Sequence, residues 1–119
     1  MDNIVEMLID YVCSIFYRIE DSNVFDLNNL VIDYYGEHLG IVVKSFRYDD
    51  NSVMLCLIVK PPMSSIDDVE NMALKICAKI DKNNDTIHEV YITRININLI
   101  NEIINIVRDF QEKLCKILR

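Results

Sequence analysis

The residues of this chain best suited to metal chemistry are its two histidines, His38 and His88. Imidazole and carboxylate groups together form typical sites for divalent metals, and Asp33 and Glu37 lie near His38 while Glu89 follows His88. Neither His38 with Glu37 nor His88 with Glu89 forms a chelate by itself. His38 and Glu37 are expected in a loop, and His88 and Glu89 are neighbours on a predicted strand, where adjacent side chains point to opposite faces. The sequence therefore predicts no metal site and no cofactor. A metal-dependent or small-ligand-binding regulatory domain that uses His38, His88 and nearby acids is the alternative.

The cysteines and the turn residues predict no catalytic site either. Gly36 and Gly40 lack the Lys-Ser/Thr pair of a phosphate-binding loop, and no serine stands in a nucleophile elbow. The cysteines are far apart, lie in apolar segments and form no C-x-x-C pair, which favours reduced core thiols over zinc or redox chemistry. They are Cys13, Cys56, Cys77 and Cys115. We therefore expect no catalytic residue and a protein that is not an enzyme.

The composition is typical of one compact domain with short loops. The chain has 119 residues, of which 51% are hydrophobic, and it contains only two glycines and two prolines. Such a chain is expected to form regular elements around one core rather than a disordered or low-complexity segment. Residues 1–119 are therefore expected to be a single domain.

The charge is acidic and unevenly distributed. The chain has 19 acidic and 12 basic residues, a formal net charge of −7, and the whole excess lies in residues 1–50. The basic surface typical of nucleic-acid-binding proteins is missing. The acidity is interpreted first as a contribution to solubility and second as an acidic face for a basic partner.

The N-terminal segment indicates a cytoplasmic protein. Asp2, Glu6 and Asp10 interrupt its apolar positions, unlike the continuous apolar core of a signal peptide. No segment approaches the roughly 20 apolar residues of a membrane span. We expect no membrane partner.

The clearest strand prediction lies at the centre of the chain. Residues 53–59 form an unbroken apolar run that is stopped by Pro61 and Pro62. Such a run predicts a central strand with both faces covered. Residues 41–48, rich in β-branched and aromatic side chains, predict a preceding strand. The polar turn at residues 49–52 should make the two strands antiparallel neighbours.

The following segment has the spacing of a helix. Ser64 or Ser65 offers an N-cap, and acids precede lysines as the helix dipole favours. Apolar residues recur at steps of three and four up to Ile80, which predicts one stripe packed on the sheet. Residues 86–95 predict a third strand, at an edge or with only one face covered.

Three more helices are expected near the ends of the chain. Residues 2–20 show a clean helical stripe, and residues 24–35 are interpreted as a short helix. Residues 97–118 predict a long amphipathic helix whose apolar stripe is wider than a helix lying once on a sheet needs. The excess would be covered by the N-terminal helix or by the same helix of a second copy. The expected interface residues are Ile100, Ile103, Ile104, Val107, Phe110, Leu114 and Ile117.

Together these elements predict an α+β fold in the order α, short α, β, β, α, β, α. The helices would pack on a small three-stranded sheet. The second and third strands would be parallel neighbours joined by a right-handed helical crossover. Alternatively, the third strand would pair on the far side of the first in a mixed sheet.

Two resemblances follow from these patterns. Residues 41–95, interpreted as strand, strand, Pro-terminated turn, Ser-capped acidic helix and strand, resemble the ββαβ module that ends cation diffusion facilitator transporters and dimerises through its sheet. Residues 90–94 read VYITR where that family has a His-Val-Glu-Pro type ending, so its metal ligands do not carry over. The acidic balance, small size and amphipathic terminal helices are similar to type III secretion chaperones, which have more strands than the three expected here.

The sequence therefore predicts a non-catalytic protein–protein interaction or assembly module that is a homodimer. The expected partner is a second copy or another protein, and neither a nucleic acid nor a clear small-molecule ligand is expected. The prediction depends on the wide apolar stripe of the last helix and on the lack of any convergent polar group of residues.

Overall fold

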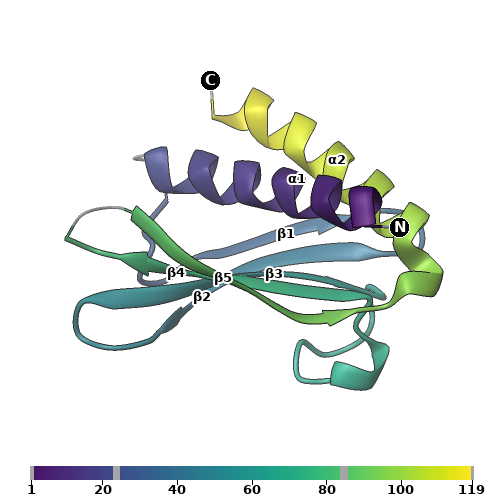
Figure 1. The fold of residues 1–119 in the computed structure, drawn as a ribbon, viewed down its shortest axis with the longest axis horizontal. Coiled ribbons are helices and arrows are strands. Elements are labelled where there is room, and N and C mark those ends of the chain that lie inside the picture. Colours follow the sequence, from purple (N-terminus) through teal and green to yellow (C-terminus); the bar gives the residue numbers. More distant parts are fainter. Residues whose placement is uncertain (1, 23–24, 84–85, 119) are drawn as a thin grey trace.

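The protein is an α+β domain in which two helices lie on one face of a five-stranded sheet (Figure 1). The computed structural model describes residues 2–22, 25–83 and 86–118. The elements are α1 (Asp2–Asp21), β1 (Val31–Tyr35), β2 (Gly40–Arg47), β3 (Ser52–Lys60), β4 (Leu74–Asp81), β5 (Thr86–Ile95) and α2 (Ile100–Ile117), with 3-10 turns at Val69–Asn71 and Ile97–Leu99. The α+β class and the packing of helices on the sheet are confirmed, whereas the expectation of three strands is wrong.

The sheet is an antiparallel meander whose strands follow one another in chain order from β1 to β5. β3 is central, and residues on both of its faces are buried, as its continuous apolar run predicts. β5 is an edge strand, which agrees with its mixed polar and apolar pattern. The antiparallel pairing of β2 and β3 across the 49–52 turn is also confirmed.

The helix predicted to begin at Ser64 or Ser65 and to end at Asn83 is wrong. Residues 74–81 form β4, which pairs with β3 on one side and β5 on the other, and only Val69–Asn71 make a single 3-10 turn. The pattern of β4 fits both periods, because Ile76 and Ile80 are four apart and also lie on one face of a strand. The hydrogen bonds of β4 with β3 and with β5 favour the strand over the helix. No helical crossover or parallel pair exists among the described strands.

The short helix predicted over residues 24–35 is replaced by a turn and β1. The part of that prediction at Val24 lies outside the described residues. β1 alternates exposed and partly buried side chains and pairs with β2. A buried hydrogen bond of 2.9 Å from Leu30 N to Ser45 Oγ connects the start of β1 to β2. This long-range partner, which no local pattern reveals, favours the strand.

The five strands also change both resemblances. Residues 41–95 contain four strands and no α-helix, so they do not form the ββαβ module of the transporters. The expected fold differed from the type III secretion chaperones in having too few strands. The sheet has five strands, so the number of strands is not a difference between them.

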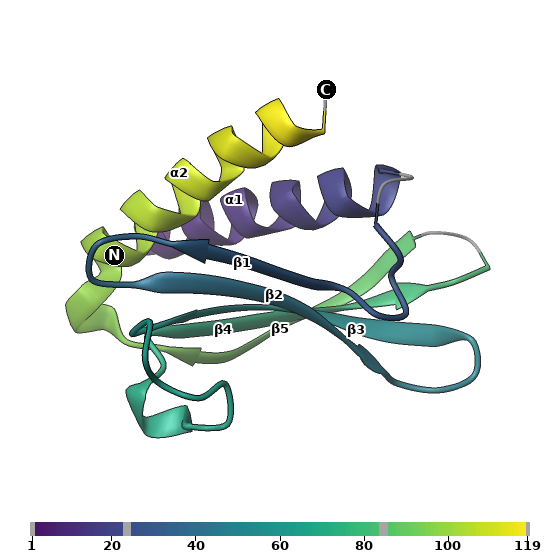
Figure 2. The same cartoon turned by 180° about the vertical axis from the view of Figure 1, so that it is seen from behind.

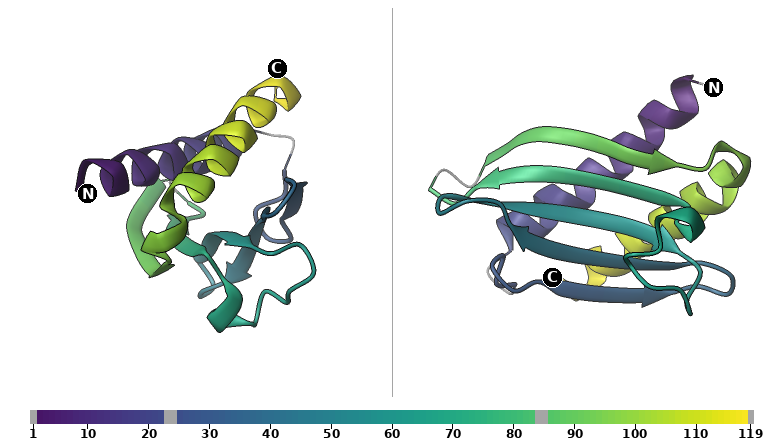
Figure 3. Two further views of the ribbon diagram at one scale, coloured as in Figure 1. Left: turned by 90° about the vertical axis from the view of Figure 1, so that its right-hand side faces the viewer. Right: turned by 90° about the horizontal axis from the view of Figure 1, so that it is seen from below.

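The two helices form a layer over the sheet. The helix predicted at residues 2–20 is α1, and the long C-terminal helix is α2, preceded by a 3-10 turn capped by Asn96, whose side chain accepts from Asn98 N. Both helices cross the same face of the sheet (Figure 3). The core lies between these layers. Within the described part of the chain, neither helix is long and apolar enough to cross a membrane.

The connection between β3 and β4 projects from the opposite face of the sheet (Figure 1). Lys60, which is 6% exposed, anchors it by donating from Nζ to Ser64 O at 2.6 Å and, at 3.4 Å, to Pro61 O and Pro62 O. Charged donors make stronger hydrogen bonds than neutral ones. The connection therefore covers the Lys60 end of this face and leaves the remainder open.

Asp49 organises the β2–β3 turn, and its removal should have a pH-dependent effect. Its Oδ1 accepts from Ser52 Oγ and from Asn51 N, each at 2.8 Å, and these hydrogen bonds, led by that of Ser52, lower the pKa of Asp49. A lowered folded-state pKa adds stability above the unfolded-state pKa of about 4. That stability is lost as the pH falls through the folded-state pKa.

We therefore expect Asp49→Asn to lower the melting temperature at neutral pH. The difference from wild type should shrink as the pH is taken below about 4, as measured by circular dichroism melts at a series of pH values. Asp67→Asn, at another exposed aspartate, is the control. A difference for Asp49→Asn that stays constant across this range would contradict the role of the carboxylate.

Candidate functional site

The stripe on α2 predicted as an interface is covered within the chain. Phe110 packs with its ring centroid 5.5 Å from that of Tyr34 on β1, and Gln111 Nε2 donates to Ser14 Oγ on α1 at 3.0 Å. Ile100, Ile103, Ile104, Val107, Phe110 and Leu114 are at most 9% exposed, whereas Ile117 is 63% exposed. α1 and the sheet thus provide the cover that the wide stripe requires. A role of these residues between two chains stays a prediction.

The two histidines are not brought together. His38 lies in the turn between β1 and β2, beside Glu37 and Glu102. His88 lies on β5 near the β4–β5 hairpin, with its Nε2 3.6 Å from Asp81 Oδ2. The β1–β2 turn and the Asp81 end of β4 are at opposite ends of the sheet (Figure 2). Among the residues that the structure describes, no group of three or more His, Cys, Asp or Glu side chains could hold a metal ion.

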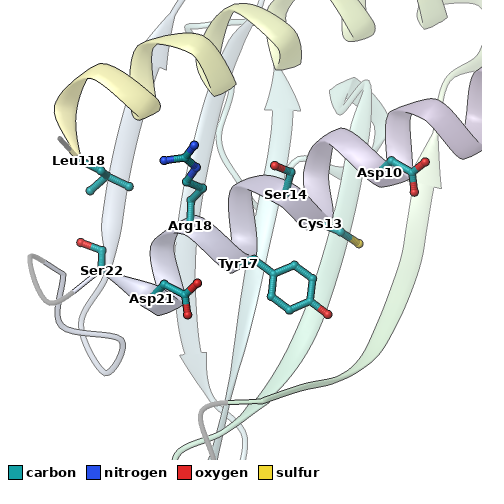
Figure 4. A pocket seen from close by; sticks show the side chains of 8 residues that line it. All are labelled: Asp10, Cys13, Ser14, Tyr17, Arg18, Asp21, Ser22 and Leu118. Carbon is teal, nitrogen blue, oxygen red and sulfur yellow. The ribbon is translucent and has the colours of Figure 1, made fainter.

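A surface hollow along α1 contains a thiol but no paired base (Figure 4). Burial, with a smaller contribution from the Asp10 carboxylate, raises the pKa of the Cys13 thiol, so less of the nucleophilic thiolate forms at neutral pH. The described residues that line this hollow include no histidine. They are Asp10, Cys13, Ser14, Tyr17, Arg18, Asp21, Ser22 and Leu118. The hollow therefore lacks the pairing of nucleophile and base that covalent catalysis requires.

The face of the sheet opposite the helices carries a cluster of exposed apolar side chains. We define the open-face patch as four side chains that line one hollow there: Phe46, Tyr48, Met54 and Tyr91. All except the partly buried Met54 are between 37% and 56% exposed. Figure 3 (right) looks onto this face, which no helix covers. Clustered exposed apolar side chains mark interaction surfaces more often than single ones do.

Lysines lie over and beside the open-face patch. Lys44 Nζ is 5.4 Å from the centroid of the Phe46 ring, and Lys79 Nζ is 4.4 Å from that of Tyr48. Both distances allow attraction between the ammonium group and the face of the ring. The patch is thus apolar at its centre and cationic around it.

The charge of the open face differs from that of the whole chain. Strand positions on the face opposite the buried core carry five basic and three acidic residues, whereas the chain has 12 basic and 19 acidic residues. The basic ones are Lys44, Lys60, Lys75, Lys79 and Arg94, and the acidic ones are Asp33, Asp81 and Glu89. The acidic excess therefore lies on the helix side and in the turns.

A disulfide lies beneath the patch. Cys56 on β3 is directly opposite Cys77 on β4, and their sulfur atoms are bonded, with the two Cα atoms 4.0 Å apart. The expectation of reduced thiols is wrong for this pair, because the register of two strands joins residues that are 21 apart in sequence. Cys13 and Cys115 are free, as predicted.

Sequence reasoning missed both the patch and the disulfide, because both require β4 to be a strand. In a helix over this segment Cys77 would lie on the sheet-facing stripe, and no pairing with Cys56 would be expected. One signal was present in the sequence. Lys75, Cys77 and Lys79 alternate with Ile76, Ala78 and Ile80, which is the period of a strand with unlike faces.

Comparisons of the chain with models of protein families, with characterised proteins and with solved structures give no significant match.

Proposed function

We propose that this chain is a cytoplasmic, non-catalytic assembly module that forms a homodimer through the open face of its sheet. The observation that supports this proposal is the open-face patch, where Phe46, Tyr48 and Tyr91 are exposed together on a face without helices. The occupant we propose is a second copy related by a two-fold axis. A two-fold interface uses the same surface on both copies, so it must be self-complementary.

Charge favours this face over the others. Two copies of a chain with a net charge of −7 repel one another where their acidic surfaces meet. The open face carries charges of both signs with a small basic excess, so lysines of one copy can approach Asp81 or Glu89 of the other. Rim contacts of this kind favour the correct partner more than they add affinity.

The size of the surface suggests a dimer of moderate affinity. Strands about 4.8 Å apart and rising about 3.3 Å per residue give an uncovered face of roughly 500 Å² beyond the β3–β4 connection. Standard stable interfaces bury about 800 Å² per partner. We therefore expect a dimer that dissociates at concentrations of about 10 μM or below.

The test is sedimentation equilibrium of the wild-type chain and of Tyr91→Glu over concentrations from about 1 μM to about 500 μM. We expect wild type to pass from monomer to dimer and Tyr91→Glu to stay monomeric, because the substitution removes an aromatic ring from the patch and adds a carboxylate that must be desolvated when the second copy binds. The expected loss of affinity is at least about 30-fold.

Two controls separate this surface from the alternatives. Tyr17→Glu replaces a tyrosine that is 52% exposed on α1, and it should leave the dimer unchanged. Ile117→Glu alters the exposed end of the α2 stripe. A wild-type chain that is monomeric throughout would overturn the proposal, as would a dimer that resists Tyr91→Glu and is broken by Ile117→Glu.

A further inference from the structure

The Cys56–Cys77 bond is not needed to define the sheet. β3 and β4 are paired from Ser52↔Asp81 to Val59↔Leu74, so the two cysteines are already held opposite each other by the strand ladder. A continuous core of buried aliphatic side chains covers the helix side of the same strands. A chain of this size can bury a core without a disulfide staple. The reduced chain is therefore expected to keep the same fold, which allows the bond to be reversible.

The surroundings of the pair favour thiol chemistry. Lys44 is directly opposite Cys56 on β2, and Lys75 and Lys79 lie two residues before and after Cys77 on the same face of β4. Three lysines on the face that carries the two cysteines raise the local positive potential, which favours the thiolate, the reacting form in thiol–disulfide exchange. Around Cys13, in contrast, the Asp10 carboxylate is the charged neighbour, and it disfavours the thiolate.

Access to the pair is from the open face. Cys56 and Cys77 are 3% and 4% exposed, but they line the same hollow as Phe46, Met54 and Tyr91. These covering groups are surface side chains rather than a helix layer, and exposed side chains change rotamer on the nanosecond timescale. Movement of these side chains is the route by which a sulfur atom would become accessible while the core on the helix side stays folded.

We propose that Cys56 and Cys77 are a reversible redox pair that exchanges with low-molecular-weight disulfides of the glutathione type. In the oxidising direction, one cysteine thiolate attacks glutathione disulfide, forms a mixed disulfide and releases one glutathione thiolate. The second cysteine thiolate then attacks the protein sulfur of the mixed disulfide and releases the second glutathione. The two electrons pass from the cysteine pair to glutathione disulfide, and the two thiol protons pass to the released glutathione thiolates.

The bond acts as a removable staple across the β3–β4 connection. It closes a loop of 21 residues, and closing a loop reduces the conformational freedom of the unfolded chain. For a loop of this length and a domain of this size, the oxidised form should melt about 10 °C above the reduced form.

The experiment uses the full chain with Cys13→Ser and Cys115→Ser, so that only the proposed pair titrates. The protein is equilibrated in glutathione buffers from fully reduced to fully oxidised, quenched with iodoacetamide and analysed by peptide mass spectrometry, with a thermal melt of each end state. We expect the Cys56–Cys77 bond to form and to be lost within this series, with the oxidised form melting higher. Cys77→Ser in the same background should show no shift in melting temperature with redox state.

Three results would overturn the proposal. The thiols could remain free in pure glutathione disulfide, the bond could survive reduced glutathione until the chain is unfolded, or both end states could melt at the same temperature. The titration is run at about 1 μM, below the concentration at which the proposed dimer should form, so the open face stays accessible and the result does not depend on whether two copies pair.

Discussion

Ala78→Asp is expected to lower the free energy of unfolding by about 3–5 kcal/mol or to prevent folding. Ala78 is fully buried in β4 on the side that faces the helices, so a carboxylate there would have neither water nor a cation. Val69→Asp should cost less than about 0.5 kcal/mol, because Val69 is 52% exposed in the β3–β4 connection. A helix over the same segment would reverse this ranking, since Val69 would lie on its buried stripe and Ala78 outside it.

Urea unfolding of the two variants measures the ranking directly. Ala78→Ser is the milder companion in case Ala78→Asp does not fold, and it should cost about 1–2 kcal/mol because a hydroxyl is less costly to bury than a charge. A greater loss of stability for Val69→Asp than for Ala78→Asp would show that residues 74–81 are not the strand described above.

Phe110→Ala is expected to lower the free energy of unfolding of the monomer by about 3–5 kcal/mol. Phe110 is 2% exposed and packs on Tyr34 of β1, so its truncation removes apolar contacts and leaves a cavity between α2 and the sheet. Ile117→Ala, at the exposed end of the same stripe, should cost less than about 0.5 kcal/mol. Comparing the two variants gives the loss of stability at a buried and at an exposed position of the same helix face.

The measurement is denaturant unfolding at about 1 μM, below the concentration at which the proposed dimer should form. The loss for Phe110→Ala should not depend on protein concentration, because its partners belong to the same chain. A monomer that is hardly affected, together with a weakened dimer, would assign the stripe to an interface between copies and overturn its assignment to the core.

Elements with one clear local period were predictable. The helical stripe of residues 2–20 became α1, and the apolar run at residues 53–59 became the central strand β3. The polar 49–52 segment became the turn that joins β2 to β3. In each of these segments the hydrophobic period and the bounding polar or proline residues agree, so local preference and tertiary packing favour the same structure.

The candidate sites depended far more on tertiary structure. His38 and His88, the strongest chemical candidates in the sequence, lie at opposite ends of the sheet. The α2 stripe, predicted as an interface between chains, is largely covered by α1, β1 and β2. The open-face patch was not predicted, because its members come from β2, β3, β5 and the turn after β2.

The acidic balance, the helical stripes at both ends and the apolar central strand could be inferred without a structure, since each depends only on the order of residues along the chain. β1 and β4 were established by strand pairing, because their hydrogen bonds are made to partner strands that local spacing does not identify. The same pairing placed Cys56 against Cys77 and left one face of the sheet open. Strand pairing joins residues distant in sequence, and for that reason it determined both candidate functional features of this protein.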